Sequence, residues 1–431
     1  MKKLALAMAT LLPFAAQAQP VFHPSGTNLT YGMNSSAPSV ISITSNPAAA
    51  AATSTRGEDS TTSAIGLISS IGLSVELGQV DNFEQQIDDL TIQLDRTNIT
   101  LTEGQQIIDD FDDFLLLAEK EGYLIINAAT HLPFMPLMIN SETLGGAITI
   151  DVNAGIQAYM GVLAAPLTYN ATSQEMETDS AFYVKGAAVL EASIGYSRKM
   201  WGNRNGNLFA GVTGKYYQVG LSKSVIPLID DTNNDVGETL ADEFDQNQNT
   251  SNGIGIDLGV LWVGNNYSLG ATLLNANSPT FDYGEIGSDC HLLTGTAQTN
   301  CNAAASYSSK INLTETYTMD AQVRLEAALH SKNKHWQINA SYDGNSVRGP
   351  VNNEIQWMNI AIGYAPDNWI PGVRAGYREN LAGSQLSMAT FGITLLKGLN
   401  LDIAYGLEEV ESDGEKYPRT IAVNLGLEMR F

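Results

Sequence analysis

The side chains that most often carry catalysis or bind metals are few in this chain and form no recognised motif. The five histidines show no i, i+4 pair and no other grouping typical of zinc sites. They are His23, His131, His291, His330 and His335. The sequence also has no G-x-S-x-G nucleophile elbow and no P-loop. We therefore expect no enzymatic activity, no cofactor and no metal.

One acidic segment has the spacing of a calcium-binding loop. Asp231, Asn233 and Asp235 alternate as the first ligands of an EF-hand do. Val236, however, stands where that loop needs glycine for its sharp turn. A weak calcium site and an ordinary solvated acidic loop both remain open, and the second is the simpler interpretation.

The two cysteines, Cys290 and Cys301, lie eleven positions apart in a polar stretch. In an exported protein such a pair predicts a local disulfide. The bond would stabilise a long surface loop by about 2–3 kcal/mol in the chain-entropy model. A redox role is not favoured, because the sequence has no C-x-x-C motif.

Charged residues alternate with apolar ones in several segments. Residues 317–329 are clear: from Tyr317 onward every second residue is apolar, and those between, as far as Glu326, are polar or charged. Residues 148–160, 254–262 and 419–431 show the same period of two. Each strand would thus have one face against an apolar medium and one against water, as in a membrane barrel with a polar interior. The charged residues assigned to the lumen are Asp151, Asp257, Asp320, Arg324, Glu326 and Asp402.

Periodicity alone leaves two questions open about these charges. They could line a permeation path or hold a plug. A soluble β-sandwich would also alternate, with its charged face outside. The C-terminus favours the membrane barrel, since the last strand ends on Phe431, an aromatic residue typical of the closing strand and assembly signal of bacterial outer-membrane barrels.

The N-terminus agrees with export. Lys2 and Lys3 precede an apolar stretch, and Ala16-Gln17-Ala18 is a small-x-small cleavage site, so residues 1–18 are predicted to be a cleaved signal peptide. The expected location is the outer membrane of a Gram-negative bacterium. The expected partners are outer-membrane lipid and the barrel-assembly machinery. The net charge of −24 argues against nucleic acid, and we expect a monomer.

Loop lengths support an all-β, antiparallel up-and-down barrel. Counting back from Phe431, short and long connections alternate, as periplasmic turns and external loops do. Trp201, Trp262, Trp336 and Trp369 fall at the short turns, which fits an aromatic belt. Fourteen strands are predicted if residues 64–80 and 128–140 both form strands. Twelve is the alternative, because Pro133 and Pro136 each remove a ladder donor.

Two long connections carry structure of their own. Residues 81–122 are predicted to be a two-helix insert, because capping-box patterns at Asp81/Glu84 and Thr102/Gln105 precede apolar residues at helical spacing. These helices would pack on each other or on the barrel mouth. Residues 275–316 are predicted to be an external loop that contains the disulfide.

The step Asn46-Pro47-Ala48 just before the first predicted strand resembles the FadL-like, long-chain fatty-acid transporter barrels. A closer similarity is to the outer-membrane family called plasmid-transfer TraF-type. There this step, a Gly-rich first strand like residues 65–78 and an acidic helix like residues 80–95 follow in the same order. The resemblance implies that residues 19–63 form an N-terminal hatch, gated at Asn46, Pro47 and Ala48, and that residues 64–431 form the barrel.

The resemblance implies an outer-membrane channel or transporter for small, hydrophobic molecules. The alternative is a non-transporting barrel for surface interaction or envelope assembly, linked to conjugal transfer, with the helical insert and disulfide loop as its working parts. A polar diffusion porin is a third reading. The ligand stays unnamed, because lumen contacts come from many strands whose register the sequence does not give.

Overall fold

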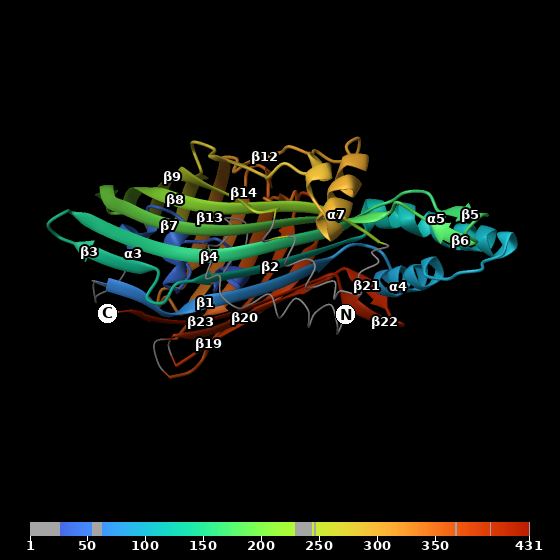
Figure 1. Cartoon of the computed structure of the whole chain (residues 1–431). Coiled ribbons are helices and arrows are strands. Elements are labelled where there is room, and N and C mark those ends of the chain that lie inside the picture. The colour runs from blue at the N-terminus through green and yellow to red at the C-terminus, as the bar shows by residue number, and fades with distance from the viewer. Residues whose placement is uncertain are drawn as a thin grey trace.

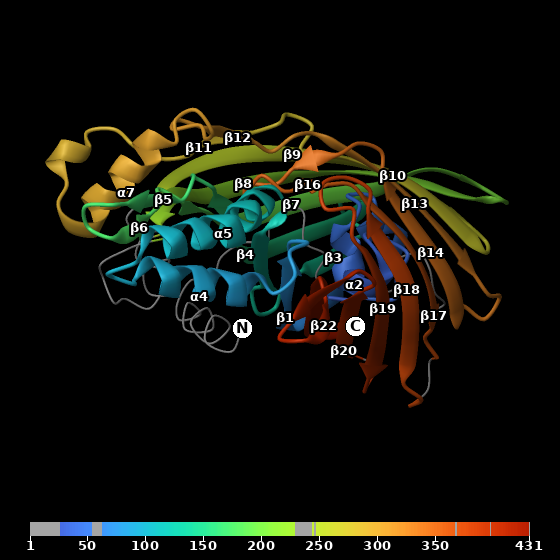
Figure 2. The same cartoon turned by 90° about the vertical axis from the view of Figure 1, so that its right-hand side faces the viewer.

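The computed structural model of this chain describes residues 26–53, 63–228, 244, 247–366, 369–396 and 398–430. The predicted signal peptide, the acidic segment from Asp231 to Asp235 and the terminal Phe431 lie outside these residues. Fifteen of the described strands form one closed antiparallel barrel (Figures 1 and 2). The all-β barrel predicted from the sequence is therefore confirmed.

The barrel wall has fourteen strand positions: its sheet contains fifteen strands, and the short β2 and β3 share one position between β1 and β4. The wall closes where β1 pairs with β23, from Ala64 opposite Arg430 to Glu76 opposite Thr420. In sequence order the strands are β1 (Ser63–Leu77), β2 (Tyr123–His131), β3 (Leu137–Ser141), β4 (Gly146–Leu163), β7 (Ala181–Asn203), β8 (Gly206–Pro227), β9 (Asn249–Gly264), β10 (Tyr267–Leu274), β13 (Gln322–His330), β14 (Trp336–Asp343), β17 (Trp357–Tyr364), β18 (Gly372–Asn380), β19 (Ser387–Leu395), β20 (Leu399–Gly406) and β23 (Thr420–Arg430).

The wall is interrupted between β2 and β3. The sequence predicts one strand over residues 128–140, whereas the structure has no strand at residues 132–136. Pro133 and Pro136 lie in this gap, and proline has no N–H to donate to a ladder. The neighbouring β1 also shifts register twice between Gly66 and Ile71. The count of fourteen is thus right, but the continuous strand is not.

Burial is inverted relative to a soluble barrel. Along β20, Leu401 and Ile403 on the outer face are 38% and 43% exposed, whereas Asp402 between them is 1% exposed. The same order holds in β13, where Arg324 is buried and Val323 is exposed. An apolar outside and a polar inside are what a barrel in lipid requires. The fold is therefore that of a membrane-spanning β-barrel.

Aromatic side chains gather at the end of the barrel with the short turns. The Trp201 and Trp262 rings lie 5.8 Å apart beside the β7–β8 and β9–β10 turns. Trp336 packs 4.8 Å from Tyr364 at the β13–β14 turn. Trp201 and Trp336 are exposed and Trp262 is half-buried, which fits the interfacial belt expected from the sequence.

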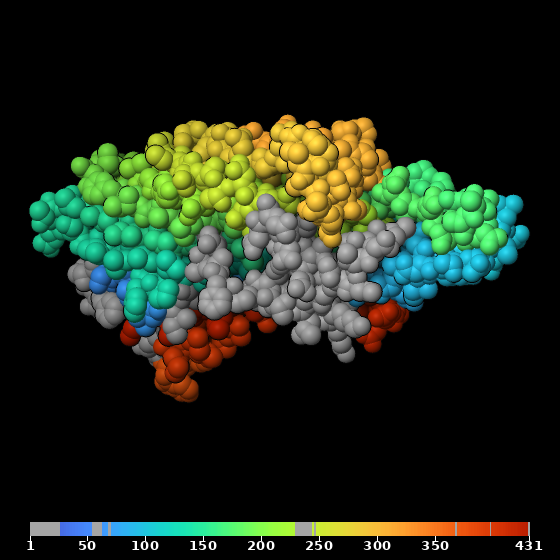
Figure 3. Space-filling model, viewed as in Figure 1, coloured from blue at the N-terminus to red at the C-terminus, as the bar shows by residue number. Residues whose placement is uncertain are grey.

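At the other end the wall continues beyond the bilayer. β7 has 23 residues and β8 has 22, about twice the ~10 that a strand needs to cross a membrane. Helices and short strands cover these outer halves and project from one end of the barrel (Figures 1 and 3). The short strands are β5 (Thr168–Asn170), β6 (Glu175–Glu177), β11 (Thr280–Asp282), β12 (Thr316–Thr318), β15 (Val347–Arg348), β16 (Glu354–Ile355), β21 (Glu409–Ser412) and β22 (Glu415–Pro418).

The predicted insert forms two helices, α4 (Phe83–Leu94) and α5 (Leu101–Glu121). Their buried side chains pack together and against Val162 at the end of β4 and residues 164–176 of the β4–β7 connection. Both predicted capping boxes are wrong. Asp81 accepts the Glu411 N–H instead, and α5 is capped by Thr100 with Glu103. Hydrogen bonds from Thr100 lower the pKa of the Glu103 carboxyl.

Among the described residues, no helix is both long and apolar enough to cross a membrane.

The predicted disulfide is confirmed. Cys290 and Cys301 are bonded, with their Cα atoms 5.4 Å apart. The bond joins η2 (Cys290–Leu292) to α7 (Gly295–Ser306). Just after α7, the Tyr307 hydroxyl donates to the Leu163 carbonyl at 3.1 Å, so the disulfide loop is anchored to the outer end of β4.

Candidate functional site

Residues 26–53, called the plug here, fill the part of the lumen near the short turns, which we call the lower lumen, with three short helices. These are α2 (Asn28–Tyr31), η1 (Ile41–Thr44) and α3 (Ala49–Thr53), seen in blue inside the wall in Figure 2. Of this segment only Pro38 is exposed. Its many small residues let it pack closely against the wall, with Val40, Ala48 and Ala52 fully buried.

Asn46, the first of the predicted hatch residues, is tied to both the plug and the wall. Its Nδ2 donates to Glu326 Oε1 at 2.8 Å and to the Val260 carbonyl at 3.2 Å. Its Oδ1 accepts the Ala48 N–H at 2.9 Å. Pro47 then lies against the wall where Gly211 leaves room, since a Cβ at that position would overlap the Pro47 carbonyl. The step predicted from the resemblance is therefore a principal contact between plug and barrel.

Three carboxylates of the wall accept hydrogen bonds from the plug. Besides Asn46, Glu326 accepts the Ser35 N–H at 2.5 Å. Glu428 accepts from the Ser39 hydroxyl at 2.7 Å and the Val40 N–H at 2.6 Å. Asp402 accepts from the Thr30 hydroxyl and also pairs with Arg374, at 2.8 and 2.5 Å. Because buried carboxylates need partners, these contacts hold the plug in one position.

The other residues assigned to the lumen pair along the wall instead. Asp151 contacts His131 Nδ1 at 2.9 Å, Asp257 contacts Lys215 at 2.8 Å, and Arg324 contacts Asp343 at 2.8 Å.

The prediction that Asp320 lines the lumen is wrong. This residue is exposed and lies before β13, which begins at Gln322. The alternating pattern continues upstream of the strand into β12, which pairs with β11 in the external loop. Of the two interpretations of the predicted lumen charges, plug holding therefore fits Glu326 and Asp402. Glu428 also holds the plug, and Arg374 does so through Asp402 and the Tyr31 ring. The sequence did not predict this role for either residue, although alternation places both on polar faces.

Replacing Asn46 by alanine should loosen the plug. The change removes the hydrogen bonds of a fully buried amide and leaves the Glu326 carboxylate with one partner fewer, a loss of about 2–3 kcal/mol in docking. Hydrogen exchange measured by mass spectrometry on peptides from residues 26–53 should become faster. Thr44→Ala is the matched control, since the Thr44 hydroxyl bonds only within the plug, to the Ile41 carbonyl. Equal exchange in the two variants would contradict this role for Asn46.

Above the plug, that is, toward the end of the barrel with the long loops, lies a cavity of about 460 Å³. Leu29 of the plug and Met388 and Ala422 of the wall line its lower part. Aromatic side chains line it from both sides, and residues 351–355 of the β14–β17 connection close it above. The aromatic residues are Tyr123, Tyr159, Tyr183 and Trp357. A mostly apolar cavity of this size with a few polar groups is typical of small-molecule sites.

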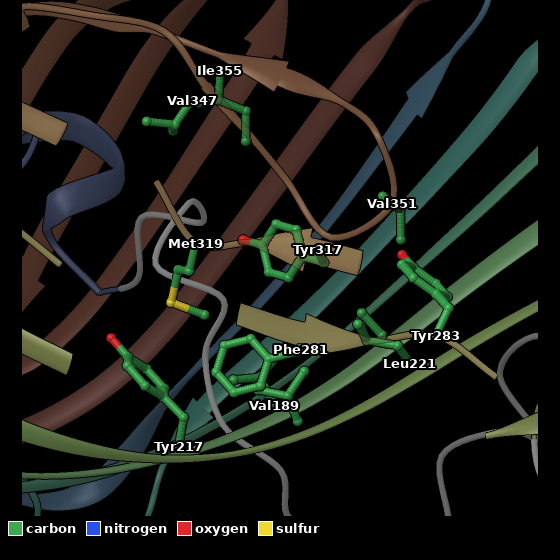
Figure 4. Close-up of a cluster of buried hydrophobic side chains, with 12 residues drawn as sticks. Val189, Tyr217, Leu221, Phe281, Tyr283, Tyr317, Met319, Val347, Val351 and Ile355 are labelled. Carbon is green, nitrogen blue, oxygen red and sulfur yellow. The ribbon is translucent and has the colours of Figure 1, made fainter. Parts of the chain in front are cut away.

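An apolar cluster separates this cavity from the external end. Phe281, Tyr283 and Tyr317 of the disulfide loop pack between the wall strands β7 and β8 and the β14–β17 connection (Figure 4). All three rings are buried. Val351 belongs to this cluster and also lines the cavity, so the cluster borders the cavity directly.

Two lysines of the wall fasten the disulfide loop above the cavity. Lys185 Nζ lies 2.8 Å from Glu315 and 4.3 Å from the centre of the Tyr283 ring. Lys223 donates to the Asn312 carbonyl at 2.7 Å. Charge-assisted and cation–π contacts of this kind are strong where water is excluded. These contacts fasten the disulfide loop to the wall on the external side of the cavity.

In the described part of the chain, His, Cys, Asp and Glu form no cluster of three or more that could hold a metal ion. The calcium-like segment lies outside that part.

The fold and the lumen together define the class of this protein: a plugged, membrane-spanning β-barrel with a ligand-sized cavity in its lumen. Residues 43–343, which are 301 of the 431 residues, match the family described as F plasmid transfer operon, TraF, protein. The chain belongs to this family, as the sequence resemblance predicted. A comparison with curated proteins found no match.

Solved outer-membrane barrels resemble the chain at low sequence identity. The Pseudomonas putida toluene transporter TodX is 13% identical, with 96% of this chain and 98% of that chain covered and a TM-score of 0.41. A Pseudomonas aeruginosa FadL homologue is 11% identical, with 96% and 99% covered and a TM-score of 0.42. The Ralstonia pickettii toluene transporter TbuX is 12% identical, with 95% and 98% covered and a TM-score of 0.37.

Proposed function

We propose that this protein is an outer-membrane channel or transporter for small, hydrophobic molecules. The observation that carries the proposal is the cavity of about 460 Å³ in the lumen, lined by aromatic side chains and set between the disulfide loop and the plug. A barrel that served only as a scaffold would have no need of a mostly apolar cavity inside its lumen. Apolar and aromatic linings bind hydrophobic molecules by removing their surface from water.

In this proposal the ligand crosses the barrel in two steps. It enters from the external end when the disulfide loop moves, rests in the cavity above Leu29, and leaves when the plug shifts. The carboxylates Glu326, Asp402 and Glu428 set the resistance of the plug to that shift. Export by the predicted signal peptide and insertion through the C-terminal strand would place the barrel in the outer membrane.

The proposal is tested by filling the cavity. Ala422→Trp adds a large ring at a lumen-facing position of β23 that lines the cavity. Cells of a Gram-negative host that express the wild type should take up the hydrophobic dye N-phenyl-1-naphthylamine faster than cells with an empty vector. In the variant, the uptake rate above the empty-vector background should fall about tenfold, because the added ring overpacks and closes the chamber. Uptake is read as dye fluorescence.

The control variant is Ile421→Trp, which adds the same ring to the lipid-facing side of β23. It should leave uptake unchanged, at equal amounts of folded barrel judged by heat-dependent gel mobility. If the wild type and the empty vector give the same uptake, the transport proposal is wrong.

A second candidate is a surface-interaction barrel, and one observation favours it. The external helices expose large apolar side chains, with Ile92, Leu101 and Leu116 at 59%, 70% and 61% exposure. Deletion of residues 81–122 separates the candidates: a transporter should keep dye uptake, whereas an interaction barrel should lose binding of its partner.

A further inference from the structure

One guanidinium in the lumen has no acidic partner. Arg324 and Arg374 each contact a carboxylate within 2.8 Å. Arg378 is equally buried, at 4% exposure, yet its Nη1 donates only to the Leu29 carbonyl at 3.5 Å and its Nε has no hydrogen-bond partner. No other hydrogen bond or ion pair of Arg378 is formed within the described part of the chain. Asp343 is the acidic group near enough to attract Arg378, but its carboxylate contacts Arg324 and the Trp357 backbone N–H instead. A buried charge without a contacting counter-charge is costly, so this one calls for an anion.

Arg378 lines the cavity, and a second unsatisfied donor lies beside it. The Trp357 ring lies 3.9 Å from the Arg378 guanidinium, and its indole Nε1 is buried without a partner. Both side chains border the same cavity. Two adjacent donors without acceptors match the two oxygens of a carboxylate, which accepts well from planar donors.

The other charged side chains that border the cavity are either paired or exposed to water. Glu76 accepts from the Tyr123 hydroxyl at 2.9 Å, and Lys185 is paired with Glu315 at 2.8 Å. Glu354 also lines the cavity but is exposed, so water can solvate its charge. The buried charge without a contacting partner in this chamber is therefore positive and lies at Arg378.

The rest of the chamber suits a flat apolar group. Tyr123 and Tyr159 stack with their ring centres 6.3 Å apart, and Tyr183 borders the same space. Aromatic rings prefer to bind other rings in stacked or edge-on contacts, whereas an alkyl chain gains only its buried area. A ligand with one ring system and one carboxylate would satisfy both parts of the chamber.

We propose that the cavity is a binding site for aromatic carboxylates, with the carboxylate held by Arg378 and the Trp357 Nε1–H and the ring among the tyrosines. This inference rests on the proposed function, because it assigns a substrate class to the same cavity. Arg378 and Trp357 are the residues that select the charged head.

The test compares 2-naphthoate with its neutral analogue 2-naphthamide. Binding of each to the purified barrel in phosphatidylcholine nanodiscs is measured by calorimetry, with empty nanodiscs subtracted. The wild type should bind the carboxylate about 10- to 100-fold more tightly than the amide, the range that a charge-assisted hydrogen bond supplies. Arg378→Gln should abolish this preference and leave amide binding unchanged. Arg96→Gln, on the exposed insert, is the control for lost charge and should keep the preference.

Equal affinities of the wild type for the two compounds would overturn the proposal, as would an Arg378→Gln variant that still prefers the carboxylate. If Arg378→Gln does not fold, Trp357→Phe decides instead: it keeps a ring, loses the indole donor and should reduce the preference several-fold, and an unchanged preference would refute the site. Dye uptake by cells is a separate readout. Uptake without carboxylate preference would refute only the substrate class, and carboxylate binding without uptake would refute transport.

Discussion

Deletion of residues 26–53 should convert a closed lumen into an open, cation-selective pore. The single-channel conductance in planar bilayers should rise at least about tenfold, because the plug fills the lower lumen of a barrel whose interior is otherwise polar. The wall strands pair with one another without help from the plug, so the barrel should still close. Glu326, Asp402 and Glu428 would lose their plug partners and face water, which favours cations in the pore.

The comparison for this deletion is the removal of residues 81–122, which takes away a longer segment from outside the lumen. That variant should keep the low conductance of the wild type. If the plug deletion also stays closed while its barrel folds, the apolar cluster at Phe281 and Tyr283 is sufficient to block ions and the plug is not the main barrier.

The alternation of apolar and polar residues was enough to predict the wall, because side-chain period and burial are local properties of a strand. It placed Glu326 and Asp402 on the polar face, and the structure has both buried in the lumen. It failed at Asp320, where a similar pattern crosses from β12 into β13 although only the second strand belongs to the wall. It also gave no sign that residues 132–136 leave the ladder, beyond the warning of two prolines.

The partners of these residues could not be predicted, because they come from distant parts of the chain. Asn46 and Glu326 are 280 positions apart, and they meet only because the plug folds back under strands that follow it. The unpaired state of Arg378 is a property of the assembled lumen as well. Nothing in its own strand distinguishes it from Arg374, four positions earlier, which has Asp402 as its partner. Sequence patterns therefore predict which residues line the lumen, and three-dimensional packing decides which of them bind.

Gly211→Val should unseat the plug without disturbing the barrel. A Cβ at Gly211 would overlap the Pro47 carbonyl, so a branched side chain there must push Asn46-Pro47-Ala48 away from the wall. Overpacking costs about 1–3 kcal/mol, which raises the undocked population about 5- to 150-fold. Hydrogen exchange of the plug and bilayer conductance should both increase. Gly214→Val on the same strand is the matched control, because a Cβ at Gly214 has no heavy atom within 4 Å. If the two variants behave alike, the contact between Gly211 and Pro47 does not hold the plug, and the gating role of the Asn-Pro-Ala step fails with it.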